Sequence, residues 1–466
     1  MVLQSSSQTL CAAKLSRHPA HARASGRCNH CVSKGGDRMK KWILAAGAAF
    51  MSITSAQAVT VVTADRMLDV TSGRYVDHPA ILIGDDGRIR QVGNIASMQL
   101  PAGTKHIDLP GETLLPGLID MHVHLNSLAE IGGYQGLKYT DAFWASVGPY
   151  NALKTIDAGF TTVRNVGSPD FDDVGLQQAI DGGWVVGPRI IPATYLLGAT
   201  GGHCDDTNGL PPSIGDKQSP GIVTSPDQAR EKVRWVHKYG AEVIKICATG
   251  GVFSLGDAVG AQQLDYDEMK AIADEAHMLG LKVAAHAHGD EGIRTAILAG
   301  IDTIEHASLA SDATIQLAKQ HGTWFDMDIY NDDYILATGT ANGTEQQSLD
   351  KERMVGLKQR QTFQKAVRAR VKMIFGTDAG VYPHGDNGKQ FAKMVQWGMT
   401  PLQAIQAATL NASEALGRSD VGVLEPGRYG DIVAVRGDPL QNVALLEHVD
   451  AVVKGGKLVK GPGATQ

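Results

Sequence analysis

Eight short apolar segments that favour β-strands alternate with amphipathic segments that favour helices, at intervals of roughly 40 residues. The strand segments are residues 113–125, 161–166, 189–197, 242–248, 282–287, 302–305, 323–328 and 373–377. The helical segments include residues 267–279 and 292–299. Alternation of this kind builds parallel sheets, and eight strands over about 300 residues match the size of a closed barrel. We therefore predict an α/β protein with a central (β/α)8 TIM barrel.

Short strands separated by turn residues flank this region on both sides. The flanking strand segments are residues 59–62, 80–83 and 89–92 on one side and 431–435, 449–453 and 457–459 on the other. β segments from opposite ends of a chain can pair with one another. We predict that residues 59–112 and 421–466 together form a small β-sandwich, and that residues 113–420 form the barrel.

Residues 39–58 have the pattern of a processing signal. Residues 39–41 form a short basic region, residues 42–53 are apolar, and Ala56-Gln57-Ala58 is a small-x-small cleavage signature. The apolar run is shorter than the roughly 20 residues that span a bilayer, so we expect no stable membrane insertion. We predict a signal peptide at residues 39–58, preceded by a non-native or disordered extension at 1–38. A bacterial protein with this signal is expected to be periplasmic or secreted.

Charge and cysteine content exclude several classes of protein. The formal net charge of −6 provides no basic field for nucleic acid, so we expect no nucleic-acid partner. Beyond the predicted signal the chain has only Cys204 and Cys247. Two cysteines are too few for the disulfide scaffold of a domain of this size, and we expect both thiols to be buried and inert.

Histidines mark the end of the first predicted barrel strand. Side chains alternate along a strand, so His122 and His124 point to the same side. They are either hydrogen-bonded core histidines or a pair of metal ligands. The fourth strand carries Lys245 in an apolar run, where a lysine is costly unless it is neutralised or paired.

Three further predicted strands end in residues of the same kind. The fifth ends in His286 and His288, the sixth in His306, and the eighth in Asp378. Active-site groups of such barrels project from these strand ends. Nitrogen and oxygen ligands of this kind suit zinc, and also manganese or cobalt. A purely structural interpretation would need a separate explanation for every one of these residues.

The sequence resembles the amidohydrolase superfamily over essentially the whole mature chain. Residues 116–124, Pro-Gly-Leu-Ile-Asp-Met-His-Val-His, are similar to its first-strand motif, and residues 427–433 to its return into the β-sandwich. The resemblance to the binuclear subtype implies two divalent metals, with zinc expected. It implies that His122, His124 and Asp378 hold one metal and that His286 and His306 hold the other.

The same resemblance implies the roles of the remaining groups. Lys245 would react with carbon dioxide, and its carbamate would bridge the metals together with a hydroxide. Asp378 would take the proton of this hydroxide and deliver it to the leaving amine. Strand parity alone leaves either His286 or His288 as the ligand. The family pattern selects His286 and leaves His288 to contact substrate.

Further motifs indicate a subgroup. Residues 161–164, 200–203 and 248–252 resemble Xaa-Pro dipeptidases and imidazolonepropionase-like enzymes. The chain is also similar to bacterial amidohydrolases that split ochratoxin A into ochratoxin α and phenylalanine. This resemblance implies a small-molecule substrate, an N-acyl amino acid or dipeptide with a free C-terminal carboxylate. Related enzymes are often multimers, so a homo-oligomer is expected.

A carboxypeptidase-like enzyme needs donors for the free carboxylate. Arg164, His203 and Tyr266 are candidates, and Tyr330 could line an aromatic pocket. Each has a structural alternative: Arg164 could pair with an acid, His203 could support a glycine-rich loop, and the tyrosines could be packing residues.

Two other functions remain as alternatives. Imidazolonepropionase shares the fold but is mononuclear and lacks the bridging lysine, so Lys245 argues against it. A non-catalytic scaffold on the same fold typically loses metal ligands, whereas all six positions are filled here.

Overall fold

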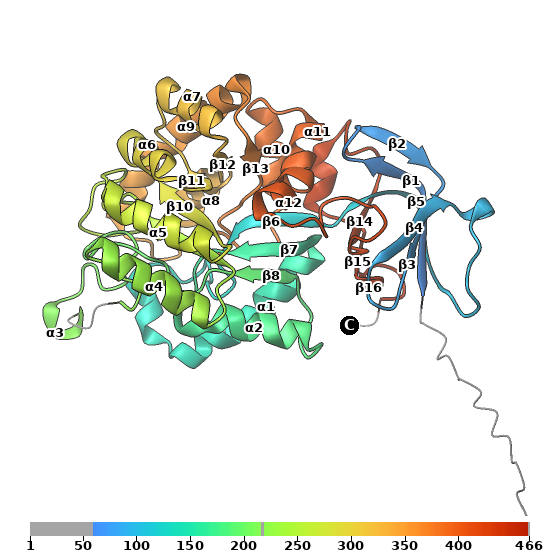
Figure 1. The fold of residues 1–466 in the computed structure, drawn as a ribbon, viewed down its shortest axis with the longest axis horizontal. Helices are drawn as coiled ribbons and strands as arrows, with labels where there is room; N and C mark the ends of the chain where they lie inside the picture. Colours follow the sequence, from blue (N-terminus) through green and yellow to red (C-terminus); the bar gives the residue numbers. More distant parts are fainter. Residues whose placement is uncertain (1–58, 216–218, 465–466) are drawn as a thin grey trace, which may run out of the picture. The chain divides into compact units, whose positions relative to one another are not determined.

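The computed structural model describes residues 59–215 and 219–464 (Figure 1). The predicted signal peptide and the extension before it lie outside the described residues. Among the described residues, no helix is both long and apolar enough to cross a membrane.

All eight predicted barrel segments contain a parallel β-strand. These strands are β6 (Leu118–Val123), β7 (Phe160–Asn165), β8 (Arg189–Pro192), β9 (Val243–Cys247), β10 (Lys282–Ala287), β11 (Thr303–His306), β12 (Trp324–Asp326) and β13 (Met373–Ile374). They form one group ordered β6-β7-β8 and a second ordered β13-β12-β11-β10-β9.

Backbone hydrogen bonds beyond the strand ends join these two groups into a ring. Leu197, after β8, exchanges bonds of 2.9 Å with Lys245 and Cys247 of β9. On the other side, the N–H of Met121 donates to the carbonyl of Phe375 at 2.9 Å. The predicted fold class, a TIM barrel with an additional β domain, is confirmed.

The helices surround the barrel strands (Figure 1). Their bounds are α1 (Asp141–Asp157), α2 (Asp172–Asp181), α3 (Pro212–Gly215), α4 (Pro226–Lys238), α5 (Tyr266–Met278), α6 (Asp290–Ala299), α7 (Asp312–His321), α8 (Asn331–Thr338), α9 (Gln346–Ala369), α10 (Lys389–Gln396), α11 (Pro401–Ala407) and α12 (Leu410–Leu416). Four 3-10 turns complete them: η1 (Ile95–Ser97), η2 (Gly133–Lys138), η3 (Pro169–Phe171) and η4 (Val443–Glu447).

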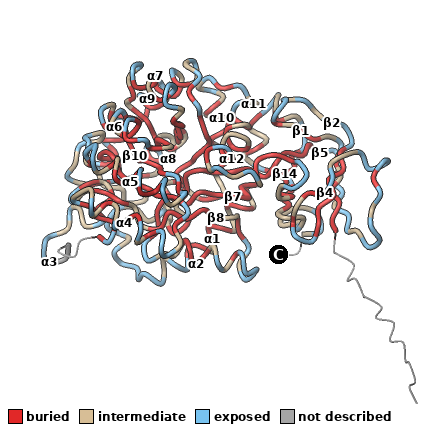
Figure 2. The backbone as a smooth tube through the Cα atoms, viewed as in Figure 1, coloured by how far each residue is buried: buried red, intermediate tan, exposed pale blue. Residues whose placement is uncertain are grey.

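Local sequence explains where these helices begin. The side chain of Asp265 accepts from the backbone of Glu268, whose side chain accepts from the backbone of Asp265 in return. This reciprocal cap starts α5. Strands and inner helix faces are buried, whereas the outer helix surfaces are exposed (Figure 2).

The β segments from the two ends of the chain pair with each other as predicted, in one continuous eight-stranded sheet. Its members are β1 (Thr60–Asp69), β2 (Arg74–Asp77), β3 (Pro79–Ile83), β4 (Ile89–Asn94), β5 (Lys105–Pro116), β14 (Ile432–Arg436), β15 (Ala451–Lys454) and β16 (Lys457–Lys460). Strand β5 pairs in parallel with β1 and antiparallel with β14. It thereby connects the two ends of the chain.

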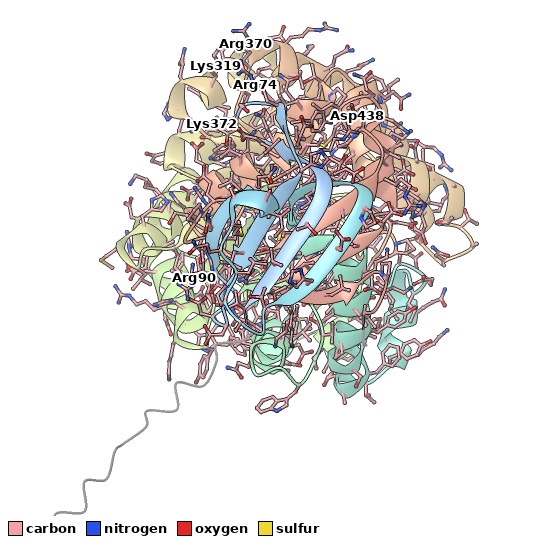
Figure 3. All side chains as sticks on the ribbon, turned by 90° about the vertical axis from the view of Figure 1, so that its right-hand side faces the viewer. Arg74, Arg90, Lys319, Arg370, Lys372 and Asp438 are labelled. Carbon is pink, nitrogen blue, oxygen red and sulfur yellow. A yellow bond between two sulfur atoms is a disulfide. The ribbon has the colours of Figure 1, made fainter. Side chains whose placement is uncertain are left out.

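A separate apolar cluster packs this sheet, which Figure 3 shows from its own side of the molecule. Val62, Ile81, Leu114, Ile432 and Val453 are among its buried members. The periphery is polar: Arg90, labelled in Figure 3, pairs with Asp86 at 2.9 Å.

Candidate metal centre

The six expected ligands lie on five different barrel strands or within four residues of their ends, and His124 directly follows β6. His122 belongs to β6, Lys245 to β9, His286 to β10 and His306 to β11, and Asp378 follows β13. All five are buried. The parallel strands bring these side chains to one end of the barrel, as expected for an active site of this fold.

The first group of donors centres on Asp378. Its Oδ1 lies 3.3 Å from Nε2 of His122 and 3.2 Å from Nε2 of His124. Nζ of Lys245 lies 3.5 Å from Nε2 of His122. These four side chains, expected to serve one metal and the bridge, are therefore brought together.

The second group consists of His286, His288 and His306, each with a ring nitrogen within 4.8 Å of the others. Donor atoms of His306, His122 and Asp378 also lie within 4.8 Å of one another, so the first and second groups of donors are adjacent. The structure places both His286 and His288 at the cluster.

These donors have the chemistry of a divalent-metal site. Nε2 of His286 is buried and has no hydrogen-bond partner in the part of the chain that the structure describes. A buried imidazole nitrogen without a partner is costly, and a metal would satisfy it. Nδ1 of His288 is 2.8 Å from Oγ of Ser308, which leaves Nε2 as the nitrogen that can meet a ligand.

Two of the donors have an unusual backbone conformation. His306 has φ of 68° and Asp378 has φ of 56°. Positive φ is uncommon for residues other than glycine, and such strain concentrates at functional sites. Here it turns both side chains at the ends of their strands, where the chain leaves the sheet.

Burial favours the neutral form of the Lys245 amine and of several imidazoles of the site, whereas Asp328 raises the pKa of His306. Burial lowers the pKa of Lys245, against the opposing charges of Glu305 and Asp378. It lowers the pKa of His122 to about 4 and that of His286 well below its usual value. Neutral imidazole is the form that binds metal.

Carboxylates behind the donors orient them. Oε2 of Glu305 lies 3.1 Å from Nδ1 of His122, and Oδ1 of Asp328 lies 2.8 Å from Nδ1 of His306. Such partners fix the ring and direct its other nitrogen to the metal. Neither acid could be recognised from its sequence position, although Glu305 directly precedes His306.

Asp120 supports the same region from β6. Its carboxylate accepts from the hydroxyl of Thr377 at 2.7 Å, from Nδ2 of Asn387 at 2.8 Å and from the backbone N–H of His122 at 3.1 Å. Burial raises the pKa of Asp120 to about 7 despite these bonds. It shares strand parity with His122, a signal that could have predicted an inward-facing acid.

Arg164, expected to bind the substrate carboxylate, lies inside the barrel and does not line the metal cavity. Its Nη2 is 2.9 Å from both oxygens of Glu305 and 3.3 Å from Oδ2 of Asp326. Nη1 donates to Thr303 at 2.9 Å. The guanidinium is therefore paired with buried acids, which is the structural role that the sequence left open for Arg164.

Neither expected tyrosine lines the metal cavity. Tyr266 is the first residue of α5 and is 44% exposed. Tyr330 precedes α8 and packs against Tyr382, with ring centroids 5.0 Å apart. Tyr330 is therefore a rim residue that packs on a neighbouring ring, whereas Tyr266 is neither a cavity residue nor a buried packing residue.

His203, by contrast, lies against the metal cluster. Its ring stacks on that of His286, with centroids 4.0 Å apart. Nδ1 is 2.9 Å from Oγ of Ser254, and the backbone N–H donates to Oε1 of Gln263 at 2.8 Å. A Cβ at Gly251 would lie 2.4 Å from this ring, so only glycine fits there.

A buried ion pair holds the loop that contacts His203. Nζ of Lys351, on α9, donates to Oδ1 of Asp257 at 2.6 Å and to the carbonyls of Gly251 and Ser254 at 2.9 and 2.7 Å. Asp257 also accepts from Gln263 at 2.8 Å. Residues distant in sequence therefore combine to position His203.

The two cysteines form a disulfide, so the expectation of two inert thiols was wrong. Cys204 directly follows His203, and Cys247 ends β9 two residues after Lys245, with Cα atoms 5.8 Å apart. The bond ties the His203 loop to a barrel strand of the centre. Their separation of 43 residues hid the pairing from sequence analysis.

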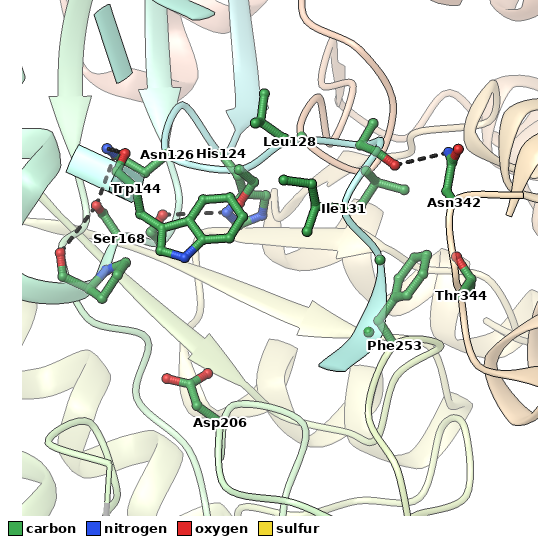
Figure 4. Close-up of a pocket in the computed structure, with 18 of the residues that line it drawn as sticks. His124, Asn126, Leu128, Ile131, Trp144, Ser168, Asp206, Phe253, Asn342 and Thr344 are labelled. Atoms are coloured by element: carbon green, nitrogen blue, oxygen red, sulfur yellow. Dashed lines mark hydrogen bonds between the residues drawn. The ribbon is translucent and has the colours of Figure 1, made fainter. Parts of the chain in front are cut away.

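A cavity of about 380 Å³ opens over the donors. Its lining includes the expected ligands and His203, His288, Asp328, Asn331, Glu352 and Gln359. A second cavity of about 450 Å³ adjoins it, with the apolar side chains of Leu128, Ile131, Trp144 and Phe253 and the carboxyl group of Asp206 on its walls (Figure 4). Both share His124, Leu196, Phe253 and Ile335, so the metal cavity continues into an apolar one.

Known proteins are similar to this chain in fold and in sequence. A solved Xaa-Pro dipeptidase with methionine bound in its active site is 35% identical, with a TM-score of 0.81 over 87% of this chain and 100% of that one. Ochratoxinase of Aspergillus niger is 30% identical over 381 residues, 75% of this chain and 76% of its own length. The solved structure of that enzyme covers 87% of this chain and 96% of its own, with 29% identity and a TM-score of 0.77. Residues 113–459 match the model of the amidohydrolase family, and the chain therefore belongs to this family.

Proposed function

We propose that this amide hydrolase cleaves N-acyl amino acids or dipeptides that carry a free C-terminal carboxylate. Ochratoxin A, an N-acyl phenylalanine, is a proposed substrate, with ochratoxin α and phenylalanine as products. One observation carries the proposal: metal-binding side chains from five strands converge beneath a cavity that continues into an apolar one. The dipeptidase and ochratoxinase among its relatives support the same substrate class.

We place two divalent metals, zinc by donor type, at this centre. His122, His124 and Asp378 would hold one, His286 and His306 the other, and a carbamate of Lys245 would join them. Bound metals would polarise the substrate carbonyl and lower the pKa of the attacking water. The lowered pKa of Lys245 supports the carbamate, because only a neutral amine attacks carbon dioxide.

Asp378 is placed to move the proton of the reaction. Burial raises its pKa, but His122 and His124 outweigh this and hold the pKa below the usual range, so the carboxylate is charged. In the proposed reaction it takes the proton of the attacking water. The oxygen of water bonds to the carbonyl carbon, the C–N bond breaks, and the proton held at Asp378 passes to the leaving nitrogen.

Recognition of the free carboxylate falls to His203 and His288, since Arg164 is committed elsewhere. Both histidines border the metal cavity. Tyr266 and Tyr330 lie outside it and cannot take their place at the substrate carboxylate. The apolar cavity around Trp144 and Phe253 has room for a bulky aromatic group.

The alternatives make different predictions. An imidazolonepropionase would need no bridging lysine, and a scaffold would need no donors, whereas Lys245 and all five other ligand positions face the centre. We extend the proposal to a homo-oligomer, which light scattering of the purified protein tests.

Metal analysis and a hydrolysis panel test this function. We expect close to two divalent metals per chain, and release of the C-terminal amino acid from N-acetyl amino acids, Xaa-Pro dipeptides and ochratoxin A. One metal or none would contradict the binuclear centre. Failure on ochratoxin A alone would remove that substrate and leave the amidase function in place.

A further inference from the structure

Glu352 is a buried acid that the proposed reaction does not use. It lies on α9, is 4% exposed, and borders the metal cavity beside Asp328, Asn331 and Gln359. Its position on the cavity wall raises the question of which substrate group it meets.

The carboxyl group of Glu352 has no hydrogen bond or ion pair within residues 59–215 and 219–464, whereas the nearby Lys351 and Gln359 are both engaged. Lys351, the preceding residue, binds Asp257, and Gln359 donates to Asp328 at 2.8 Å. Leaving a buried carboxyl without a partner is costly, so its retention on a cavity wall points to a ligand.

Acidic side chains outweigh cations around Glu352. Arg360, on the same helix, is paired with Asp332 and Asp333 at 3.0 Å each, and His306, across the cavity, is paired with Asp328. Burial and the charges of Asp332 and Asp328 raise the pKa of Glu352 to about 8. A positive ligand beside Glu352 would favour the ionised carboxylate and so lower this pKa.

Asn331 adds a second acceptor to the same wall. Its Nδ2 donates to Asp328, while its Oδ1 is buried without a partner in the described part of the chain. Two acceptors without donors call for a ligand group that donates, and an ammonium donates three hydrogen bonds and carries the complementary charge.

We propose that Glu352 binds an ammonium group of the substrate and so determines specificity between charged and neutral amides. The ammonium is either the N-terminal amine of a dipeptide or the side-chain amine of a lysine. This proposal rests on the proposed amide hydrolysis and adds a preference to it.

Two pairs of substrates, matched except for one ammonium group, separate these sources. Glycyl-phenylalanine and propionyl-phenylalanine differ in the N-terminal ammonium, and propionyl-lysine and propionyl-norleucine differ in the side-chain ammonium. We expect wild type to favour the charged member of one pair by about tenfold or more in kcat/KM, as typical for a charged hydrogen bond.

The variant Glu352→Gln should lose this preference and keep kcat/KM for the neutral member within about twofold of wild type. Asp350→Asn, an exposed change on the same helix, is the matched control and should retain the preference. Thermal unfolding of both variants checks their folding. If Glu352→Gln does not fold, the ratio of kcat/KM between charged and neutral substrates in wild type still tests whether the enzyme prefers an ammonium group.

Equal kcat/KM within both pairs for wild type would overturn the ammonium site while leaving amide hydrolysis intact. An equal loss on all four substrates in Glu352→Gln would also overturn it and assign Glu352 a structural role. Absence of hydrolysis of all four by wild type would contradict the proposed function itself, and the ammonium site with it.

Discussion

Lys245 shows how a single residue can indicate chemistry. An ammonium in the middle of an apolar strand has no ordinary role, and the structure buries it 3.5 Å from a ring nitrogen of His122. Its type and position could be predicted because a costly residue in a strand needs a specific reason.

Replacement of Lys245 by alanine should remove the proposed bridge. We expect kcat/KM to fall by at least about 100-fold and the metal content to fall below two per chain, because a ligand is lost. Metal analysis and initial rates measure this. Lys270→Ala, on the exposed face of α5, is the control. Full activity with two metals in Lys245→Ala would refute the bridge.

Arg164 shows the limit of residue-scale prediction. The sequence placed it at a strand end but could not reveal Glu305 and Asp326, which come from β11 and β12. Only the closed barrel brings these acids around the guanidinium.

Arg164→Met should therefore impair folding stability. We expect a loss of about 3–5 kcal/mol in the free energy of unfolding, because two buried acids lose their cation. Denaturant unfolding monitored by circular dichroism measures it. Arg230→Met, in an exposed pair with Asp227, should cost less than about 1 kcal/mol. Equal effects of the two variants would contradict the buried network.

At the scale of elements, all eight barrel strands and the pairing between the two chain ends could be predicted, because local apolar patterns mark strands and turns. The ends of the strands were harder to predict from the sequence. Residues 189–197 read as one strand, but β8 ends at Pro192 and pairing resumes only at Leu197. The loop at residues 251–263 has no periodic sequence pattern. Its contacts with His203 therefore became visible only in the structure.

The Cys204–Cys247 disulfide should stabilise both the fold and the site. The double variant Cys204→Ser/Cys247→Ser should lose about 2–4 kcal/mol of unfolding free energy, since a loop of this length is released. KM should rise more than kcat falls, because the loop carries His203 rather than the metal ligands. Reductant should reproduce the effect in wild type and leave the variant unchanged. Unchanged KM on reduction would contradict the role of the bond in positioning His203.

At the scale of the molecule, the centre joins much of the barrel. Its donors come from β6, β9, β10, β11 and the segment after β13, so bound metal should link one side of the ring to the other. Chelation should lower the melting temperature, because metal bound only to the native state stabilises it by mass action. Differential scanning fluorimetry with and without chelator, followed by zinc addition, measures this. An unchanged melting temperature after verified metal removal would show that the barrel is stable without metal.

Export is the remaining proposal for the whole chain. Disulfides persist in oxidising compartments, which agrees with the predicted signal peptide. Expression in a bacterial host should release a chain that begins at Val59, as N-terminal sequencing of the extracytoplasmic fraction would show. Recovery of the unprocessed chain in the cytoplasm would refute cleavage and export.

The pairing of β5 with β14 also determines when the eight-stranded sheet can form during protein synthesis. Residue Pro116 lies opposite Ile432, so β5 leaves the ribosome roughly 300 residues before its partner strand is synthesised. Until then one edge of β5 is open, and an open edge is a template for aggregation. The eight-stranded sheet can therefore be completed only after β14, β15 and β16 have been synthesised.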